Sequence, residues 1–446
     1  MALRIYLTAV LLALAAPEAW PQAPAPPPAL DKLRIPFDQW FAEGDREEVP
    51  WKVDFWKPWL RLDQRIGFSV NATVSGKQLA KLGPAHDLYL GARLGRPEGP
   101  WLGHGIVGAQ IEKPLEKNIE LRLTLGFLVR PGKYMLAVFL YDDSTGKRSF
   151  MTGRLEVPPL RKDPLAGADQ NLPVVEIVPG ESGLDAFFNP SITSRLNLPV
   201  ITRRPLRVEI IANTSGSDGE SGAAERRSLG FAITGLKLFA QLGVANGTLH
   251  LTALDIPRRK ILFEQEEVHS IDWAGLRTAL DSIDPVTISV QALQGRKENA
   301  AFFRNTVMDK LRERFRERAP AANAGAGNGG SASPAAPRPL RVFIIVSPAL
   351  MFARGTDMTP VPAEACDDCR VYLLRRYSWT PLAYESAFPS GGRRRRFGSP
   401  WIPRSHFSDD QLHRLLKPLA PRTFNIYDAG DLRQAMGRIL ADLRQY

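Results

Sequence analysis

The sequence predicts a mixed α and β protein with two domains, an N-terminal antiparallel β-sandwich and a C-terminal doubly wound α/β domain. The length of 446 residues allows two or three domains. Apolar and polar residues alternate between residues 65 and 160, which is typical of half-buried strands. After residue 204, strand-like and helical patterns follow one another in turn, which is typical of an α/β sheet.

The N-terminus has the pattern of a secretion signal. A short cationic start, Met1–Arg4, precedes an apolar run, Ile5–Ala16, and small residues suited to cleavage. The run is short for a membrane span, and no later segment is long enough. We expect residues 1–20 to be a signal peptide, with an uncleaved N-terminal anchor as the alternative, and the protein to be exported to the periplasm or the cell exterior.

The chain is basic, with a formal net charge of +11. In an exported protein, this charge argues against nucleic acid as a partner. It favours an acidic protein or another anionic component of the cell envelope, and it is compatible with peripheral membrane contact. The sequence does not indicate an oligomeric state.

A spacer is expected over residues 21–48, where a Pro/Ala tract passes into an aromatic-rich segment. The aromatic residues continue into the next domain and include Trp40, Trp51, Phe55, Trp56 and Trp59. Burial against a neighbouring sheet is the favoured interpretation of these side chains, and a stacking platform for sugars is the alternative.

The β-sandwich is expected over residues 49–160. Alternating strands are predicted at 66–74, 119–127, 134–140 and 149–157, and turn residues such as "RPGKY" and "DDSTGK" separate them. Short strands at such intervals suggest an immunoglobulin-like (Ig-like) sandwich, although the Cys-Trp-Cys core of antibody domains is absent. A connector is expected over residues 161–203, with one or two strands packed on either domain.

The α/β domain is expected over residues 204–446. Strands are predicted at 206–212, 247–256, 260–267, 286–293, 340–347 and 370–377, and helices at 229–244, 272–283, 299–315 and 428–446. A low-complexity tract, residues 319–338, separates a helix from a strand of the same sheet. It is therefore predicted to be a flexible insertion within the domain and not a domain boundary.

The two cysteines, Cys366 and Cys369, are predicted to form a small structural disulfide, because an exported chain with two close cysteines most simply pairs them. A thiol redox centre would favour the first cysteine at a helix N-terminus. Here two aspartates separate the pair, and an apparent strand follows.

The stretch "IIANTSGS", residues 210–217, runs from a buried strand into a loop of oxygen-bearing side chains. With the alternation of strands and helices and the closing segment "FNIYDAGDLRQAMGRILADLRQY", it resembles the von Willebrand factor A (VWA) domain of bacterial exported proteins. The resemblance covers residues 204–446. It implies a Rossmann-like sheet with a metal-ion-dependent adhesion site at its top, in which a divalent cation is held by an Asp, two Ser, a Thr and a second Asp and completed by a partner's carboxylate.

The chain departs from this ligand pattern. Asn213 stands in the place of the first Asp, while Ser215 and Ser217 are retained. The strand that should end in the second Asp has Ser347, and the loop expected to provide Thr reads "QGRKEN". Without carboxylates, neutral oxygens do not offset the loss of the hydration shell of Mg²⁺. The site is therefore predicted to be degenerate and free of metal and cofactor.

The favoured interpretation of Asn213, Ser215 and Ser217 is a turn and helix cap. Asp218 or Glu220 is the alternative route to metal binding.

The predicted function is therefore a non-enzymatic interaction module. No catalytic motif is recognisable, and the binding surface is expected at the C-terminal edge of the sheet. The residues expected to border it are Asn213, Ser215, Ser217, Arg393, Arg394, Arg395 and Arg396. Two alternatives remain open: a metal-dependent adhesion module that uses Ser215 and Ser217, and a thiol-disulfide redox protein that uses Cys366 and Cys369.

Overall fold

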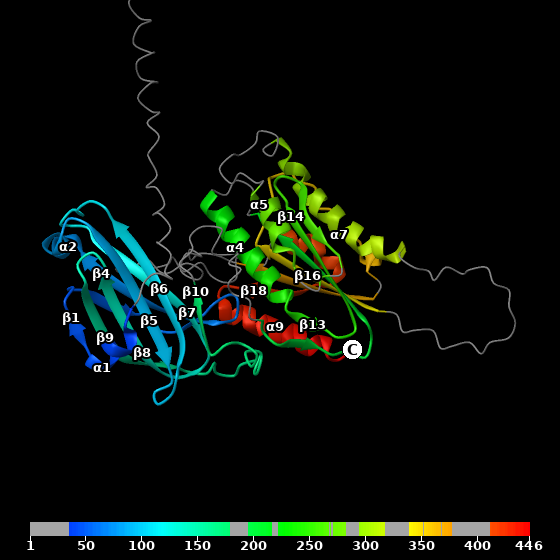
Figure 1. The fold of residues 1–446 in the computed structure, drawn as a ribbon. Helices are drawn as coiled ribbons and strands as arrows, with labels where there is room; N and C mark the ends of the chain where they lie inside the picture. Colours follow the sequence, from blue (N-terminus) through cyan, green and yellow to red (C-terminus); the bar gives the residue numbers. More distant parts are fainter. Residues whose placement is uncertain are drawn as a thin grey trace, which may run out of the picture.

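The computed structural model describes residues 35–178, 195–215, 222–266, 268, 271–281, 294–316, 339–350, 352–366, 368–376 and 411–446. Within it, strands and helices are mixed, and the strands include extensive antiparallel sheet, as the predicted α+β class requires. The N-terminal sheets and the C-terminal α/β layers lie side by side (Figure 1). The predicted signal peptide, strand 286–293, insertion 319–338 and Arg393–Arg396 lie outside the described residues.

The N-terminal part consists of two antiparallel sheets. The first has the order β1 (Arg46–Glu47), β9 (Lys147–Val157), β8 (Gly132–Asp142), β5 (His86–Gly95) and β6 (Trp101–Ile111). The second has the order β10 (Val175–Val178), β7 (Glu120–Val129), β4 (Ile66–Ser75) and β2 (Lys52–Phe55), and β3 (Trp59–Leu60) also pairs with β4. Strands β4, β7, β8 and β9 occupy the predicted positions, whereas β5, β6 and the short helix α2 (Gly76–Leu82) were not predicted.

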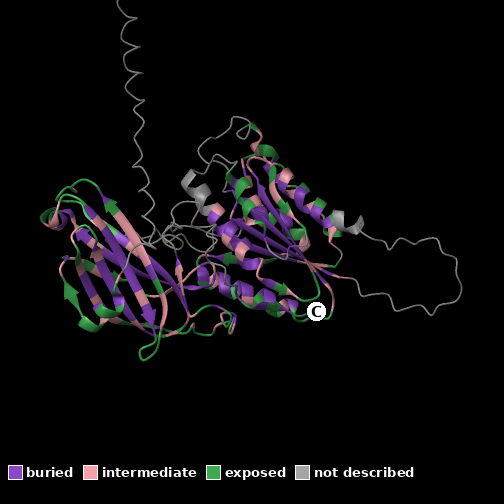
Figure 2. Ribbon diagram, in the orientation of Figure 1, coloured by how far each residue is buried: buried purple, intermediate pink, exposed green. Residues whose placement is uncertain are grey.

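One apolar core lies between these sheets. It contains alternate residues of β4 together with side chains of β5, β7 and β8. Helix α1 (Phe37–Glu43) lies against the first sheet (Figure 1), and its residues Phe37 and Trp40 pack against Phe139 and Phe150. Much of the strand backbone in this part of the chain is coloured as buried (Figure 2). Burial of Trp40 agrees with the favoured interpretation of the aromatic segment, although Phe55 remains 41% exposed.

The C-terminal part has a six-stranded sheet in the order β15-β14-β12-β16-β17-β18. Its strands are β12 (Leu206–Asn213), β14 (Gly247–Asp255), β15 (Lys260–Gln265), β16 (Leu340–Pro348), β17 (Cys369–Arg376) and β18 (Arg422–Ile426). All neighbours are parallel except β14 and β15. In chain order this is 3-2-1-4-5-6, so the direction of winding reverses between β12 and β16.

Helices cover both faces of this sheet. One core joins the sheet to α4 (Gly222–Phe239), α5 (Trp273–Asp281) and α9 (Ala429–Leu443). A second core joins the opposite face to α7 (Asn299–Arg316) and α8 (Gln411–Leu416). Alternate residues of β12 point to opposite faces, so Ile210 belongs to the first core and Ile211 to the second. This two-sided burial explains the nearly continuous apolar runs of β12 and β16.

Short 3₁₀ helices complete the described elements: η2 (Arg296–Glu298), η3 (Ala363–Ala365) and η6 (Lys417–Leu419). Among the described helices, none is long and apolar enough to span a membrane.

The segment between the two parts contributes a strand to each of them. β10 extends the second antiparallel sheet by pairing with β7. β11 (Leu198–Val200) pairs in parallel with β13 (Leu242–Val244), beside the α/β sheet. Leu165 and Leu172, which precede β10 in the chain, belong to the same core as α9. The two parts are therefore joined by apolar packing as well as by the chain.

Candidate functional site

The candidate site is the carboxyl edge of the parallel strands, at the point where the strand order reverses. Open α/β sheets bind ligands at this point because the chain leaves the two neighbouring strands in opposite directions and opens a crevice. Here the two strands are β12, which ends at Asn213, and β16, which ends with Ser347 and Pro348. The structure therefore brings together Asn213 and Ser347, which are 134 positions apart in the sequence.

Asn213 is fully buried, and its side chain amide makes four hydrogen bonds. The amide nitrogen donates to the Ser215 carbonyl oxygen at 3.0 Å and to Ser347 Oγ at 3.1 Å. The amide oxygen accepts from the Ser215 backbone N–H at 3.2 Å and from Ser215 Oγ at 2.7 Å. These bonds use both donors and both acceptor positions of the amide. A carboxylate in the same place could not donate either of the first two.

The loop after β12 is also tied to β14. Ser215 Oγ accepts from the Ile256 backbone N–H at 3.1 Å, and the Thr214 N–H and hydroxyl both donate to the Leu254 carbonyl, at 2.9 and 3.1 Å. The turn predicted for this loop is present, because the Asn213 side chain bonds to the backbone two residues on. Among the described residues, Ser215 accepts from the loop after β14; residues 216–221, which lead to the following helix, lie outside them, so the predicted cap stays a prediction.

Burial also corrects the expected role of these side chains. Asn213 and Ser215 are 0% and 2% exposed, so neither is available for the direct partner contact expected from the sequence. They instead join the end of β12 to β16 and to the loop after β14. Ser217, Asp218 and Glu220 lie outside the described residues, as do the four consecutive arginines.

The charges at this edge do not favour a divalent cation. The carboxylate at the end of β14, Asp255, is buried and is engaged by the Arg258 guanidinium at 2.6 Å and the Arg258 N–H at 3.1 Å. In the described ranges, no three His, Cys, Asp or Glu residues gather closely enough to hold a metal. The side chains that the fold places at the ends of β12 and β16, Asn213 and Ser347, are thus neutral and are hydrogen-bonded to each other.

Two buried arginines at this edge were not recognised from the sequence. Arg375 and Arg376 end β17, directly beside Ser347 and Pro348 of β16. They are 7% and 3% exposed. Arg375 donates through Nε and Nη2 to Asn425 Oδ1, at 3.1 and 2.7 Å. The Arg376 guanidinium lies 5.5 Å from the centre of the Phe231 ring. The sequence signal was the unusual charge pair in "VYLLRRY", at the end of an apolar strand.

Cationic residues lie beside this edge of the sheet, on the side of β14. We use "basic rim" for Arg258, Arg259, Arg296 and Lys297, which belong to the loop after β14 and to η2. Arg259 connects the two segments by donating to Asn299 Oδ1 at 3.3 Å and lying 3.7 Å from the Glu298 carboxylate. Lys297 is exposed. The rim therefore carries cationic side chains into solvent next to the switch point.

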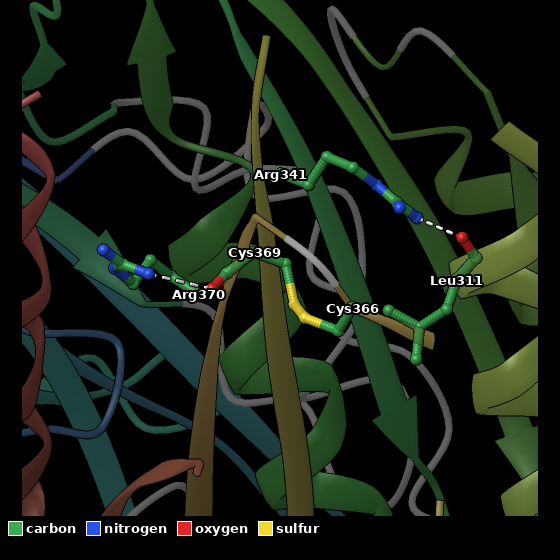
Figure 3. The surroundings of a disulfide bond; sticks show 5 residues. All are labelled: Leu311, Arg341, Cys366, Cys369 and Arg370. Atoms are coloured by element: carbon green, nitrogen blue, oxygen red, sulfur yellow. Dashed lines mark hydrogen bonds between the residues drawn. A yellow bond between two sulfur atoms is a disulfide. The ribbon is translucent and has the colours of Figure 1, made fainter. Parts of the chain in front are cut away.

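The cysteines lie at the opposite end of the parallel strands, where β17 begins. They form the predicted disulfide, with Cα atoms 5.6 Å apart (Figure 3). Cys369 begins β17 opposite Arg341 near the start of β16, and both cysteines pack against the core on the α7 face. Cys366 directly follows η3 and so is not at a helix N-terminus, where a reactive thiolate is stabilised. This position favours a structural role.

The comparisons with known proteins do not identify a family. No family model and no curated protein matches the chain. Among solved structures, the structural genomics target SoR45 is 15% identical with a TM-score of 0.18, over 25% of this chain and 88% of the target. A Bacteroides uniformis beta-glucuronidase is 11% identical with a TM-score of 0.19, over 66% of this chain and 33% of the enzyme.

A family 123 glycoside hydrolase from Clostridium perfringens is 9% identical with a TM-score of 0.22, over 84% of this chain and 72% of the enzyme. These similarities are too low to carry an inference about fold or activity.

Proposed function

We propose that the chain is an exported, non-enzymatic interaction protein, in which an Ig-like β-sandwich precedes a degenerate VWA-like domain that binds its partner without a metal ion. The observation that carries this proposal is the closed hydrogen-bond network of Asn213, Ser215 and Ser347 at the switch point. In the VWA family this is the position of the cation. Here the position is filled by hydrogen bonds between residues of the chain itself.

The strand order supports the fold assignment. A 3-2-1-4-5-6 sheet with helices on both faces is doubly wound, as a VWA-like domain requires. Two antiparallel sheets around one core are the architecture expected of an Ig-like sandwich. The strand order and the sequence resemblance favour the same domain types.

The cost of placing a metal ion at this position supports the same proposal. A divalent ion at Asn213 would need to break hydrogen bonds among buried groups and lose its own water shell. At the carboxyl ends of β12 and β16, the described side chains Asn213 and Ser347 supply no negative charge to offset these costs. The buried guanidinium groups of Arg375 and Arg376, on the adjacent strand, add repulsion.

We infer that the partner is an acidic protein or another anionic component of the cell envelope, and that it contacts the basic rim. The rim is cationic and borders the carboxyl edge of the sheet, so it offers the opposite charge to such a surface. Export to the periplasm or cell exterior, inferred from the N-terminal sequence, would bring the protein to this partner.

Two measurements test the proposal. Isothermal titration with Mg²⁺ and Mn²⁺ is expected to show no saturable heat, and crosslinking capture from the native envelope is expected to persist in EDTA. The double variant Arg296→Glu and Lys297→Glu should lose capture because it reverses two charges of the rim, whereas Lys77→Glu, on an exposed position of α2 in the other part, should not. Micromolar Mg²⁺ binding that Ser215→Ala abolishes would instead establish the metal-dependent alternative.

A further inference from the structure

An asparagine–glycine pair lies where the chain turns from β13 into β14. Asn246 belongs to this turn, Gly247 is the first residue of β14, and both residues are exposed. β14 runs from here to Asp255, and the basic rim follows the far end of the strand. The pair therefore lies at the amino end of the parallel strands, at the other end of β14 from the proposed partner surface.

The fold requires a glycine directly after Asn246. Gly247 has a φ of 150°, a backbone conformation that residues with a side chain rarely adopt. A Cβ atom at this position would also collide with the Leu206 carbonyl oxygen, because β12 passes close to the start of β14. The Gly247 nitrogen is therefore not shielded by a side chain of its own residue.

The Gly247 N–H takes no part in the ladder between β12 and β14. Leu206 lies opposite Gly247, and its N–H donates to the Asn246 carbonyl at 2.8 Å. In a parallel ladder, a residue that bonds across the gap does so with the two residues that flank its opposite neighbour, so the Gly247 N–H points away from β12. On that side, the pairing of β14 with β15 begins only at Leu251, and no described strand accepts this N–H.

The Asn246 side chain is able to approach this nitrogen. Its carboxamide makes no hydrogen bond with any described residue, in contrast to the fully bonded amide of Asn213. Exposed side chains without such bonds change rotamer within nanoseconds. Rotation of this side chain brings Asn246 Cγ next to the Gly247 nitrogen, and a bond between these two atoms closes a succinimide ring.

We propose that Asn246 is a site of spontaneous deamidation, the reaction that makes asparagine one of the thermolabile residues. The Gly247 nitrogen loses its proton and bonds to Asn246 Cγ, the bond from Cγ to Nδ2 breaks, and the side-chain nitrogen leaves as ammonia. Water then opens the ring at either of its two carbonyls and produces aspartate or isoaspartate. The reaction consumes a water molecule and releases ammonia, and it needs no oxidant, cofactor or enzyme.

Both products add a negative charge, and isoaspartate also alters the backbone. When the ring opens at the main-chain carbonyl of residue 246, the chain continues to Gly247 through the former Cγ and is longer by one carbon. The carbonyl that accepts from the Leu206 N–H is then detached from β14. Leu206 is fully buried, so its N–H is left with a displaced partner, which is unfavourable. The isoaspartyl form should therefore unfold at a lower urea concentration than the unmodified protein.

Peptide mapping of the full-length protein during incubation at neutral pH tests the proposal. Samples are digested at mildly acidic pH to suppress further conversion, and tandem mass spectrometry distinguishes asparagine, aspartate and isoaspartate. Asn246 should convert at least about tenfold faster than Asn118, which is also exposed but precedes the branched Ile119, whose N–H is bonded to the Glu116 carbonyl. The conversion should accelerate as the pH rises, because the attacking nitrogen must lose its proton.

The unfolded chain separates the effect of the fold from that of the dipeptide. Because the fold leaves both reacting groups unengaged, the rate at Asn246 in the native protein should lie within about tenfold of its rate in urea-unfolded protein. Asn328 and Gly329, the second asparagine–glycine pair of the sequence, lie outside the described residues and fall on a different peptide.

Two variants assign the chemistry. Asn246→Gln would need a larger ring and should convert at least about tenfold more slowly than wild type. Asn246→Asp forms the same succinimide with loss of water, so it should accumulate isoaspartate at this position. Urea unfolding of fresh Asn246→Asp measures the effect of the charge alone, and unfolding of the incubated protein adds the effect of the altered backbone.

The proposal is overturned if Asn246 in the native protein converts no faster than Asn118. It is also overturned if native Asn246 is protected by more than about tenfold relative to the unfolded chain, because the fold would then engage one of the two reacting groups.

Discussion

Replacing Asn213 with Asp is the sharpest perturbation of the closed network, because it changes one heavy atom of a fully buried side chain and restores the residue type that a VWA-like metal site requires. The new carboxylate keeps the two bonds accepted from Ser215 but loses the two donated to the Ser215 carbonyl and Ser347 Oγ. We therefore expect Asn213→Asp to destabilise the protein.

The size of the effect follows from the groups left unsatisfied. Each buried acceptor that loses its donor costs about 1–3 kcal/mol, and the stronger bonds from Ser215 to a charged oxygen offset part of this loss. A net cost near 3 kcal/mol for the ionised form corresponds to an upward shift of about 2 pKa units, from about 3.9 to about 6. Between pH values of about 3.9 and about 6, the native state of the variant therefore keeps a proton on the new carboxyl group that the unfolded state has already released.

The sign of the pH dependence follows from this difference. Between about pH 4 and pH 6 the unfolded variant binds fewer protons than the native variant, so the free energy of unfolding falls as the pH rises. Relative to wild type, the variant should lose about 3 kcal/mol more above about pH 6 than below about pH 4, where the single O–H of the neutral acid still leaves one of the two donated bonds unmade. Urea unfolding of both proteins at pH 4 and pH 7 measures it. The control Asn213→Ala introduces no titratable group, so its loss should not depend on pH.

Two results would refute this reasoning. Equal stability of Asn213→Asp and wild type at pH 7 would mean that the network tolerates a carboxylate. A rise in the unfolding temperature of the wild type on addition of Mg²⁺ would mean that the loop after β12 binds metal despite its neutral ligands.

Three further predictions concern the contact between the two parts and the disulfide. Gly437→Ala should lower the free energy of unfolding by about 1–3 kcal/mol, because the new Cβ would lie 2.5 Å from Pro164 Cβ. This loss is expected although Ala has a higher helix propensity than Gly. A variant that is more stable than wild type in urea unfolding would contradict the close contact. Burial raises the pKa of Asp163, but hydrogen bonds from Arg433 and the Leu165 N–H, together with the Arg433 charge, outweigh burial and lower this pKa overall. The ionised Asp163 should therefore stabilise the protein above about pH 4, and this stabilisation should decline as the pH falls further. Arg433→Gln should remove that decline in acid unfolding. Reduction of the Cys366–Cys369 disulfide should cost about 2 kcal/mol, the value for a four-residue loop, and leave partner capture unchanged, whereas loss of capture would favour the redox alternative.

Much of the α/β part could be predicted from the sequence because its signals are local. The apolar run of β12 and the helical spacing in α9 are set by burial of one or both faces of an element. The helix predicted at 428–446 has apolar residues at helical spacing, which include Leu432, Met436 and Ile439, and these three are buried. Strands β5 and β6 were missed, because β6 contains three glycines and mostly half-buried residues and thus lacks a clear alternation.

The candidate site shows the limit of local signals. The sequence identified Asn213 as the residue that removes the metal charge, but it suggested that the side chain would face a partner. Its burial depends on Ser347 and on the loop after β14, which the fold brings from distant parts of the chain. The buried arginines that end β17 were missed for the same reason.

The sequence by itself determined much of the order of strands and helices in the α/β part, the replacement of carboxylates in the loop after β12 and the pairing of the two cysteines, because each depends on neighbouring residues. Only the tertiary structure decided that the amide of Asn213 is saturated, that the cysteines lie at the opposite end of the parallel strands, and that the Gly247 N–H stays outside the ladder between β12 and β14. Hydrogen-bond saturation is a property of groups that meet in space, and the residues that satisfy Asn213 are up to 134 positions away in the chain.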